Sequence, residues 1–279
     1  MAGSYGFGMD NDPKTTVSTF ALRPLGGEML KPAELVEVDG AEKLTLNARR
    51  AFNLLLHNAH GPDMAIPHKR FTIPLAQLKF SHAGNERLAQ AIKSLMRTIV
   101  TIRSPDRVEL VPLLGRTTIA DRKNDRGYLT YEFDPVLVEL LRDSQIFAKL
   151  QLDVIHAVSS KYALALYEIV AKRARLSYVR SETFEIEQFR AMLGVEAGKL
   201  GTYSNLLKFA IRPAFEEVNR LAEFHAAFEP VKIGRKVGAI KIAWAIKSPE
   251  AQKLAYTELH GAPALPTAGR QAEIPGLLE

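Results

Sequence analysis

The sequence contains few residues whose types and spacing suit catalysis or metal binding. It has no cysteine, which excludes disulfides, cysteine-ligated zinc, iron–sulfur clusters and thiol catalysis. His57 and His60 have helical spacing, but the sequence suggests no third ligand beside them. Glu216 and Glu217 are adjacent, so on a helix they lie on different faces and do not form a general acid–base pair. We therefore expect a protein that is not an enzyme and that needs no metal or other cofactor.

A phosphate-binding loop is also not predicted. Residues 194–200, GVEAGKL, approach such a loop most closely, but they have one residue too few between the glycines. Leu200 also stands where a Ser or Thr holds magnesium. No His-x-His pair accompanies a candidate tyrosine, so a nickase that forms a phosphotyrosine link is not supported.

The sequence does contain residues suited to hydrogen bonding with DNA bases. They lie in a predicted helix that begins at Ser204. The hydroxyl of Ser204 can accept a hydrogen bond from the first turn. The apolar spacing leaves three polar residues on the outward face, Asn205, Lys208 and Arg212. Asn can pair with adenine and Arg with guanine, whereas Lys208 can hold a base or a phosphate. The alternative is an ordinary solvated face of an amphipathic helix.

The residues on either side of this outward face affect how the helix is placed. Lys199 and Tyr203 lie just before it and are expected to position its backbone on DNA. Pro213 removes one backbone hydrogen bond, which predicts a kink or a break near Ile211.

The positive charge of the chain is concentrated in its second half. The chain has 37 Lys and Arg against 31 Asp and Glu, a net charge of +6, and residues 156–247 alone hold fifteen against nine. The basic residues gather at the end of a first helix, on the third helix and on a hairpin, which are the surfaces that a winged helix lays on DNA. Outside the third helix, the predicted contacts are Lys172, Arg173, Arg175, Arg235 and Lys236.

The elements that position these residues occur twice. Apolar positions 48, 51, 52, 55, 56 and 59 recur 115 residues later, within helices capped at Asn47 and at Ser159 or Ser160. Each helix is followed by a short strand (residues 71–73 and 184–186), a short helix (74–80 and 187–193), a third helix (88–99 and 207–218) and a hairpin (108–114 with 128–133, and 224–233 with 239–246). This order is typical of a winged helix, so we predict an α+β fold with two tandem winged-helix domains. The alternative is a coincidental match between amphipathic helices.

The domain limits follow from composition. We expect flexible tails at 1–40 and 249–279, a first winged helix at 41–150 and a second at 151–248, with a short helix from Asp134-Pro135 to Leu141 between the units. In the less basic first domain, Asn85, Arg87 and Lys93 are expected to contact phosphate or to form a protein interface. No apolar stretch is long enough to span a membrane and the N-terminus lacks a signal, so we expect a cytoplasmic protein without membrane contact.

Three stretches of the second domain resemble a known family, the iteron-binding replication initiator (Rep) proteins of bacterial plasmids. They are SKYALALYE at 160–168, FEIEQFRAMLG at 184–194 and PAFEEVN at 213–219, and the resemblance covers about residues 42–247. The family usually has consecutive basic residues before the Pro-Ala pair, whereas here Lys208 and Arg212 are separated by Phe-Ala-Ile.

The resemblance implies two winged helices that bind repeated double-stranded DNA sites, the iterons, at a plasmid origin. Such proteins help to open the origin and recruit the host initiator and the replicative helicase without enzymatic chemistry. It also implies a homodimer, joined through the first domain and bound to the operator of its own promoter, in equilibrium with a monomer that binds iterons. A transcription regulator without replication activity and a winged-helix protein-interaction module remain as alternatives.

Overall fold

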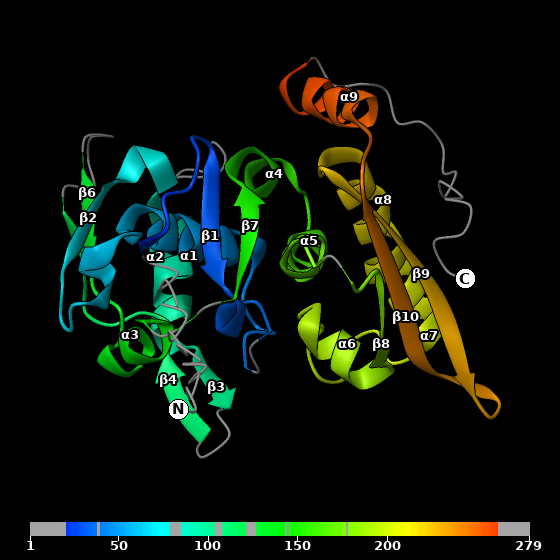
Figure 1. Ribbon diagram of the computed structural model, residues 1–279. Helices are drawn as coiled ribbons and strands as arrows, with labels where there is room; N and C mark the ends of the chain where they lie inside the picture. The colour runs from blue at the N-terminus through cyan, green and yellow to red at the C-terminus, as the bar shows by residue number, and fades with distance from the viewer. Residues whose placement is uncertain are drawn as a thin grey trace, which may run out of the picture.

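The computed structural model describes residues 21–37, 40–78, 85–103, 108–120, 127–142, 144, 146–176 and 178–261. Two domains of helices and strands lie side by side, with α4 and α5 between them (Figure 1). None of the helices within these ranges is long and apolar enough to cross a membrane.

The first domain contains two small sheets and a two-stranded hairpin around the helix α1. Its elements are β1 (Glu28–Pro32), α1 (Leu46–Ala59), β2 (Phe71–Pro74), a 3-10 turn (Leu75–Leu78), α2 (Asn85–Arg97), β3 (Ile99–Arg103), β4 (Val108–Pro112), β5 (Thr117–Ala120), β6 (Tyr128–Tyr131), α3 (Pro135–Arg142), β7 (Phe147–Gln151) and α4 (Leu152–Ala157). Thr45, rather than the predicted Asn47, caps α1, since its hydroxyl accepts a hydrogen bond from the Ala48 amide at 3.2 Å. The predicted cap of α3 is confirmed, because Asp134 Oδ1 accepts from the Val136 amide at 2.9 Å.

The second domain follows the predicted order of a winged helix. Its elements are α5 (Lys161–Arg173), β8 (Ser181–Glu185), α6 (Ile186–Met192), α7 (Tyr203–Leu206), a π-helical turn (Leu207–Ile211), α8 (Arg212–Leu221), β9 (Phe224–Ile233), β10 (Lys236–Ile246) and α9 (Pro249–His260). The sheet order is β8-β10-β9, and Ser160 caps α5. The prediction of two winged helices in an α+β fold is confirmed for this chain.

Two segments predicted as tails are ordered elements. All five residues of β1 are buried, and the strand pairs antiparallel with β7, Glu28 opposite Gln151 and Pro32 opposite Phe147. After the second domain, Ser248 caps α9 by accepting from the Ala251 amide at 3.3 Å, and Ala255 is buried. Each segment is too short to show a long apolar pattern in the sequence. Its structure depends on packing against the domains, which the sequence pattern does not reveal.

The hairpin predicted in the first domain is wrong in its pairing. Residues 108–114 were expected to pair with 128–133, whereas β4 pairs with β3 and β6 pairs with β5 and β2. The error arises because the sequence pattern does not predict β3. Ile99 is predicted at the end of the third helix but begins β3, and β3 is the strand that pairs with β4.

Buried polar contacts join the two domains across α1 and α5. The Glu168 carboxylate on α5 accepts from Lys31 Nζ of β1 at 2.8 Å and from Asn53 Nδ2 of α1 at 2.6 Å. The Arg50 guanidinium donates to the backbone carbonyls of Ile155, His156 and Val158. One continuous apolar core runs through both domains, so the contacts fix their relative placement.

Candidate nucleic-acid interface

The third helix of the second domain runs without interruption from Tyr203 to Leu221 and is called here the reading helix. Thr202 caps it, because its hydroxyl accepts from the Asn205 amide at 3.2 Å. The predicted cap, Ser204, therefore lies inside the first turn. Thr202 carries the same hydroxyl chemistry, so sequence alone places the helix start two residues late.

A π-helical turn, Leu207–Ile211, occupies the middle of the reading helix. The Arg212 amide donates to the carbonyl of Leu207, five residues earlier. Pro213, in the first turn of α8, has no N–H to offer to the carbonyl four residues before it, which is that of Phe209. The helix is therefore not broken near Ile211 as one of the two predicted outcomes required, and the effect of Pro213 is a wider turn within one continuous helix. Such turns are frequent at functional sites.

The three predicted base-reading residues lie together on the exposed face of the reading helix. Asn205, Lys208 and Arg212 are exposed, as is Ser204, whereas the opposite face packs into the core. That core face is formed by Leu206, Ala210, Ile211, Ala214, Phe215 and Val218. The arrangement presents one amide and two cations to an external ligand, and the roles of these side chains remain predictions.

The approach to the reading helix is held by an arginine of α6. Arg190 donates to the carbonyls of Leu200 at 2.7 Å and Lys199 at 2.6 Å, and this leaves the Lys199 side chain exposed. Tyr203 is half-buried, and its hydroxyl has no hydrogen-bond partner among the described residues. Burial raises the pKa of Tyr203, while the nearby Arg212 opposes that shift.

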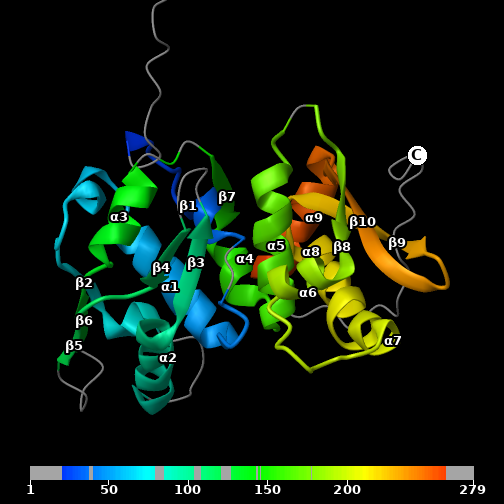
Figure 2. The same cartoon turned by 90° about the horizontal axis from the view of Figure 1, so that it is seen from below.

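The wing is a hairpin of β9 and β10 that extends beyond the body of the domain (Figures 1 and 2). Its two-residue turn has Gly234 at φ +66° followed by Arg235, which matches a type II′ turn with glycine first. Arg235, Lys236 and Lys232 are exposed at this tip. The ring of Phe215 lies 4.7 Å from that of Phe228, so the wing packs directly on the reading helix.

The basic residues at the end of α5 do not join this surface. Arg173 is buried and forms ion pairs with Glu37 and with Glu182, the latter at 2.6 Å, so its predicted DNA contact is corrected. Lys172 is engaged with Glu37 at 3.2 Å. Figure 2 shows that the link between α5 and β8 lies on the edge opposite α7, and Arg175, although exposed, belongs to that link. One acidic partner, Glu37, comes from a distant segment, and the other, Glu182, lies nine residues after Arg173 on β8, so a count of charges along the sequence does not reveal either ion pair.

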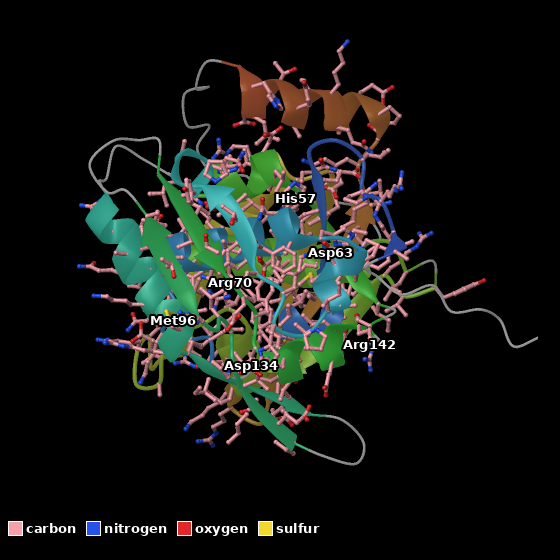
Figure 3. All side chains as sticks on the ribbon, turned by 90° about the vertical axis from the view of Figure 1, so that its left-hand side faces the viewer. His57, Asp63, Arg70, Met96, Asp134 and Arg142 are labelled. Carbon is pink, nitrogen blue, oxygen red and sulfur yellow. The ribbon has the colours of Figure 1, made fainter. Side chains whose placement is uncertain are left out.

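The corresponding helix of the first domain, α2, faces the same side as the reading helix. Both α2 and α7 lie along the lower edge of Figure 2, and α2 lies at the left edge of Figure 3, with Met96 labelled near its end. Arg87 and Lys93 are exposed on α2, as is Arg97. The side chain of Asn85, the third residue predicted there, lies outside the described residues.

Two residues of the PAFEEVN stretch have structural roles that the sequence did not indicate. Glu217 Oε1 accepts from the Ser159 amide at 2.7 Å, which attaches α8 to the start of α5. Asn219 donates to the carbonyl of Ala226 at 2.8 Å and accepts from its amide at 2.7 Å, so it holds β9 against the end of the reading helix.

Within the described ranges, no group of three or more His, Asp or Glu side chains could hold a metal ion.

Comparison with known proteins supports the fold. Residues 28–171 match the family model "Initiator Replication protein, WH1", and residues 185–244 match "Initiator Rep protein, WH2". None of the curated proteins matches the chain. Among solved structures, the chain is similar to that of the Pi initiator protein in complex with iteron DNA, with a TM-score of 0.58, 16% identity, 79% of this chain covered and 98% of the other. That likeness shows a shared fold.

Proposed function

Because the chain belongs to the initiator Rep protein family, we propose that it starts plasmid replication by binding repeated duplex DNA sites, the iterons, at the origin. The observation that carries the proposal is the exposed face of the reading helix, where Asn205, Lys208 and Arg212 lie beside a basic wing. Helices of this size enter the major groove, and a wing contacts the flanking backbone. The iteron DNA in the Pi initiator structure is consistent with this use of the fold.

The placement of the two domains sets the size of the proposed site. The first turn of the reading helix, α7, and α2 lie on one side of the molecule (Figure 2), so one copy can engage two successive grooves of a duplex. Grooves on one face recur every helical turn, which gives a footprint of about 20 base pairs. The more basic second domain supplies base contacts, and Arg87 and Lys93 of the first supply phosphate contacts.

The proposal extends to a homodimer that forms through the first domain and represses its own promoter by binding the operator. The β3–β4 hairpin forms a separate two-stranded sheet, and its exposed residues include Ile99, Val108 and Leu110. Exposed apolar strand edges of this kind favour pairing with a second copy. The monomer then binds the iterons and recruits the host initiator and the replicative helicase.

Binding across salt concentrations tests the core of the proposal. The purified protein is titrated against duplexes that carry the origin repeats of its own plasmid and against random duplexes of equal length. We expect tight binding to the repeats that weakens steeply with salt, because each phosphate contact releases counterions. Weak binding that is equal on both DNAs would contradict site recognition, and negligible, salt-insensitive binding would favour an interaction module.

A second measurement separates replication from regulation alone. A replicon that carries the repeats and the gene is introduced into the host, beside a copy with Arg212→Ala. Maintenance of the first and loss of the second is expected. If neither is maintained although the protein binds the repeats, the chain is a regulator.

A further inference from the structure

Phe209 interrupts the polar face of the reading helix. It is 54% exposed, and apart from Pro213 it is the only apolar side chain exposed along Tyr203–Leu221. Single exposed apolar residues are common on protein surfaces, so exposure alone carries no function. The position of Phe209 is what makes it informative, because it lies four residues after Asn205 and three before Arg212.

Phe209 shares the outward face of the helix with the three polar residues. Positions 205, 208, 209 and 212 have the i, i+3, i+4, i+7 spacing of one helix face, all four side chains are exposed, and Lys208 and Phe209 lie within the π-helical turn. Lys208 Nζ lies 5.2 Å from the centroid of the Phe209 ring. The Phe209 ring and the Lys208 ammonium therefore lie next to each other on the helix surface, between the amide of Asn205 and the guanidinium of Arg212.

We infer that Phe209 recognises thymine through its 5-methyl group. In the major groove, thymine is the only base that presents a methyl group, and apolar side chains distinguish it by contact. The exposed ring provides such a contact, and the adjacent ammonium of Lys208 is placed to hold a phosphate of the same strand. The inference rests on the proposed DNA binding and adds a base and a residue to it. The site should contain a thymine between the base pairs contacted by Asn205 and Arg212.

Replacement of thymine by deoxyuridine tests this assignment, since deoxyuridine lacks only the methyl group. Each thymine of one origin repeat is replaced in turn, and binding is measured for the unchanged protein, Phe209→Ala and Tyr178→Ala. Tyr178 is 97% exposed in the link after α5, on the opposite edge of the domain, and serves as the matched aromatic control. Thermal unfolding by circular dichroism verifies that the variants fold.

At one thymine, we expect deoxyuridine to weaken binding of the unchanged protein and of Tyr178→Ala about fourfold, the value for one buried methyl group. Phe209→Ala should be insensitive to that replacement and should keep its responses at all other positions. An unchanged deoxyuridine profile in Phe209→Ala, or no sensitive thymine in the unchanged protein, would overturn the inference while repeat-specific binding persists. Loss of preference for the repeat over random DNA in the unchanged protein would instead overturn the proposed function.

Discussion

Replacing Glu168 by glutamine is expected to lower the free energy of unfolding by about 3–5 kcal/mol, the range for removal of one partner of a buried ion pair. The Glu168 side chain is 2% exposed and that of Lys31 is 6% exposed, with 2.8 Å between their charged atoms. Glutamine keeps the volume and can still accept from Asn53, but it leaves the ammonium of Lys31 buried without a countercharge. Burial already lowers the pKa of Lys31, and Glu168 opposes that shift.

The double variant Lys31→Met with Glu168→Gln tests whether the unpaired charge of Lys31 causes the loss of stability in Glu168→Gln. With both charges removed and the Asn53 contact kept, we expect it to regain at least about 2 kcal/mol relative to Glu168→Gln. Urea unfolding can be followed by the fluorescence of Trp244, the only tryptophan in the chain. A loss below about 1 kcal/mol in Glu168→Gln, or strictly additive effects of the two substitutions, would refute a coupled buried pair.

The pH dependence supplies an independent check on the same pair. Because the pKa of Lys31 is lower in the folded than in the unfolded chain, the unfolded chain binds more protons between the two values, and stability rises with pH there. Loss of the Glu168 charge lowers the folded pKa further, so the rise should be larger in Glu168→Gln and absent from the double variant.

Three further outcomes follow from other contacts. Arg235→Ala and Lys236→Ala at the exposed tip of the wing should weaken binding to specific and random DNA alike and reduce the salt slope by about 1 each, measured by fluorescence anisotropy. Burial lowers the pKa of Lys247 from its ordinary value of 10.5 to about 8 in the folded chain. The free energy of unfolding should therefore rise with pH between about pH 8 and pH 10.5, and urea titrations of Lys247→Met should lack this rise. Asn219→Ala should cost about 1–3 kcal/mol by leaving both backbone groups of Ala226 without their partner, whereas an unchanged urea midpoint would show that water replaces it.

The sequence predicted those features that depend on local periodicity. The apolar spacing of α1 and α5, the pairing of β9 with β10, and the outward face with Asn205 and Arg212 all follow from patterns within about twenty residues. The same patterns could not show that β1 joins the first domain, because a five-residue strand is defined by its partner β7, more than a hundred residues later.

The charge of the second domain illustrates the same limit. Arg173 and Lys247 both contribute to its net positive charge, yet Arg173 pairs with Glu37 and Glu182, and Lys247 Nζ donates to the carbonyls of Asn219 and Ala222. Sequence counts charges but does not distinguish an exposed cation from one that holds the fold together. Exposed cations remain at the reading helix and at the wing.

The contact between the domains includes a pairing of the kind that lies on the two-fold axis of a homodimer. Asn53 and Glu168, which bond to each other, are 115 positions apart, the offset of the internal repeat. Arg50 of α1 donates to carbonyls just before α5, and Lys161 of α5 donates in return to the carbonyl of Glu42, just before α1. A residue that bonds to its own repeat equivalent, as Asn53 does, is characteristic of a two-fold axis. Under the proposed function, one chain presents its two helices to DNA as a symmetric pair does, and we expect the unequal charge of its halves to give it a direction along the duplex.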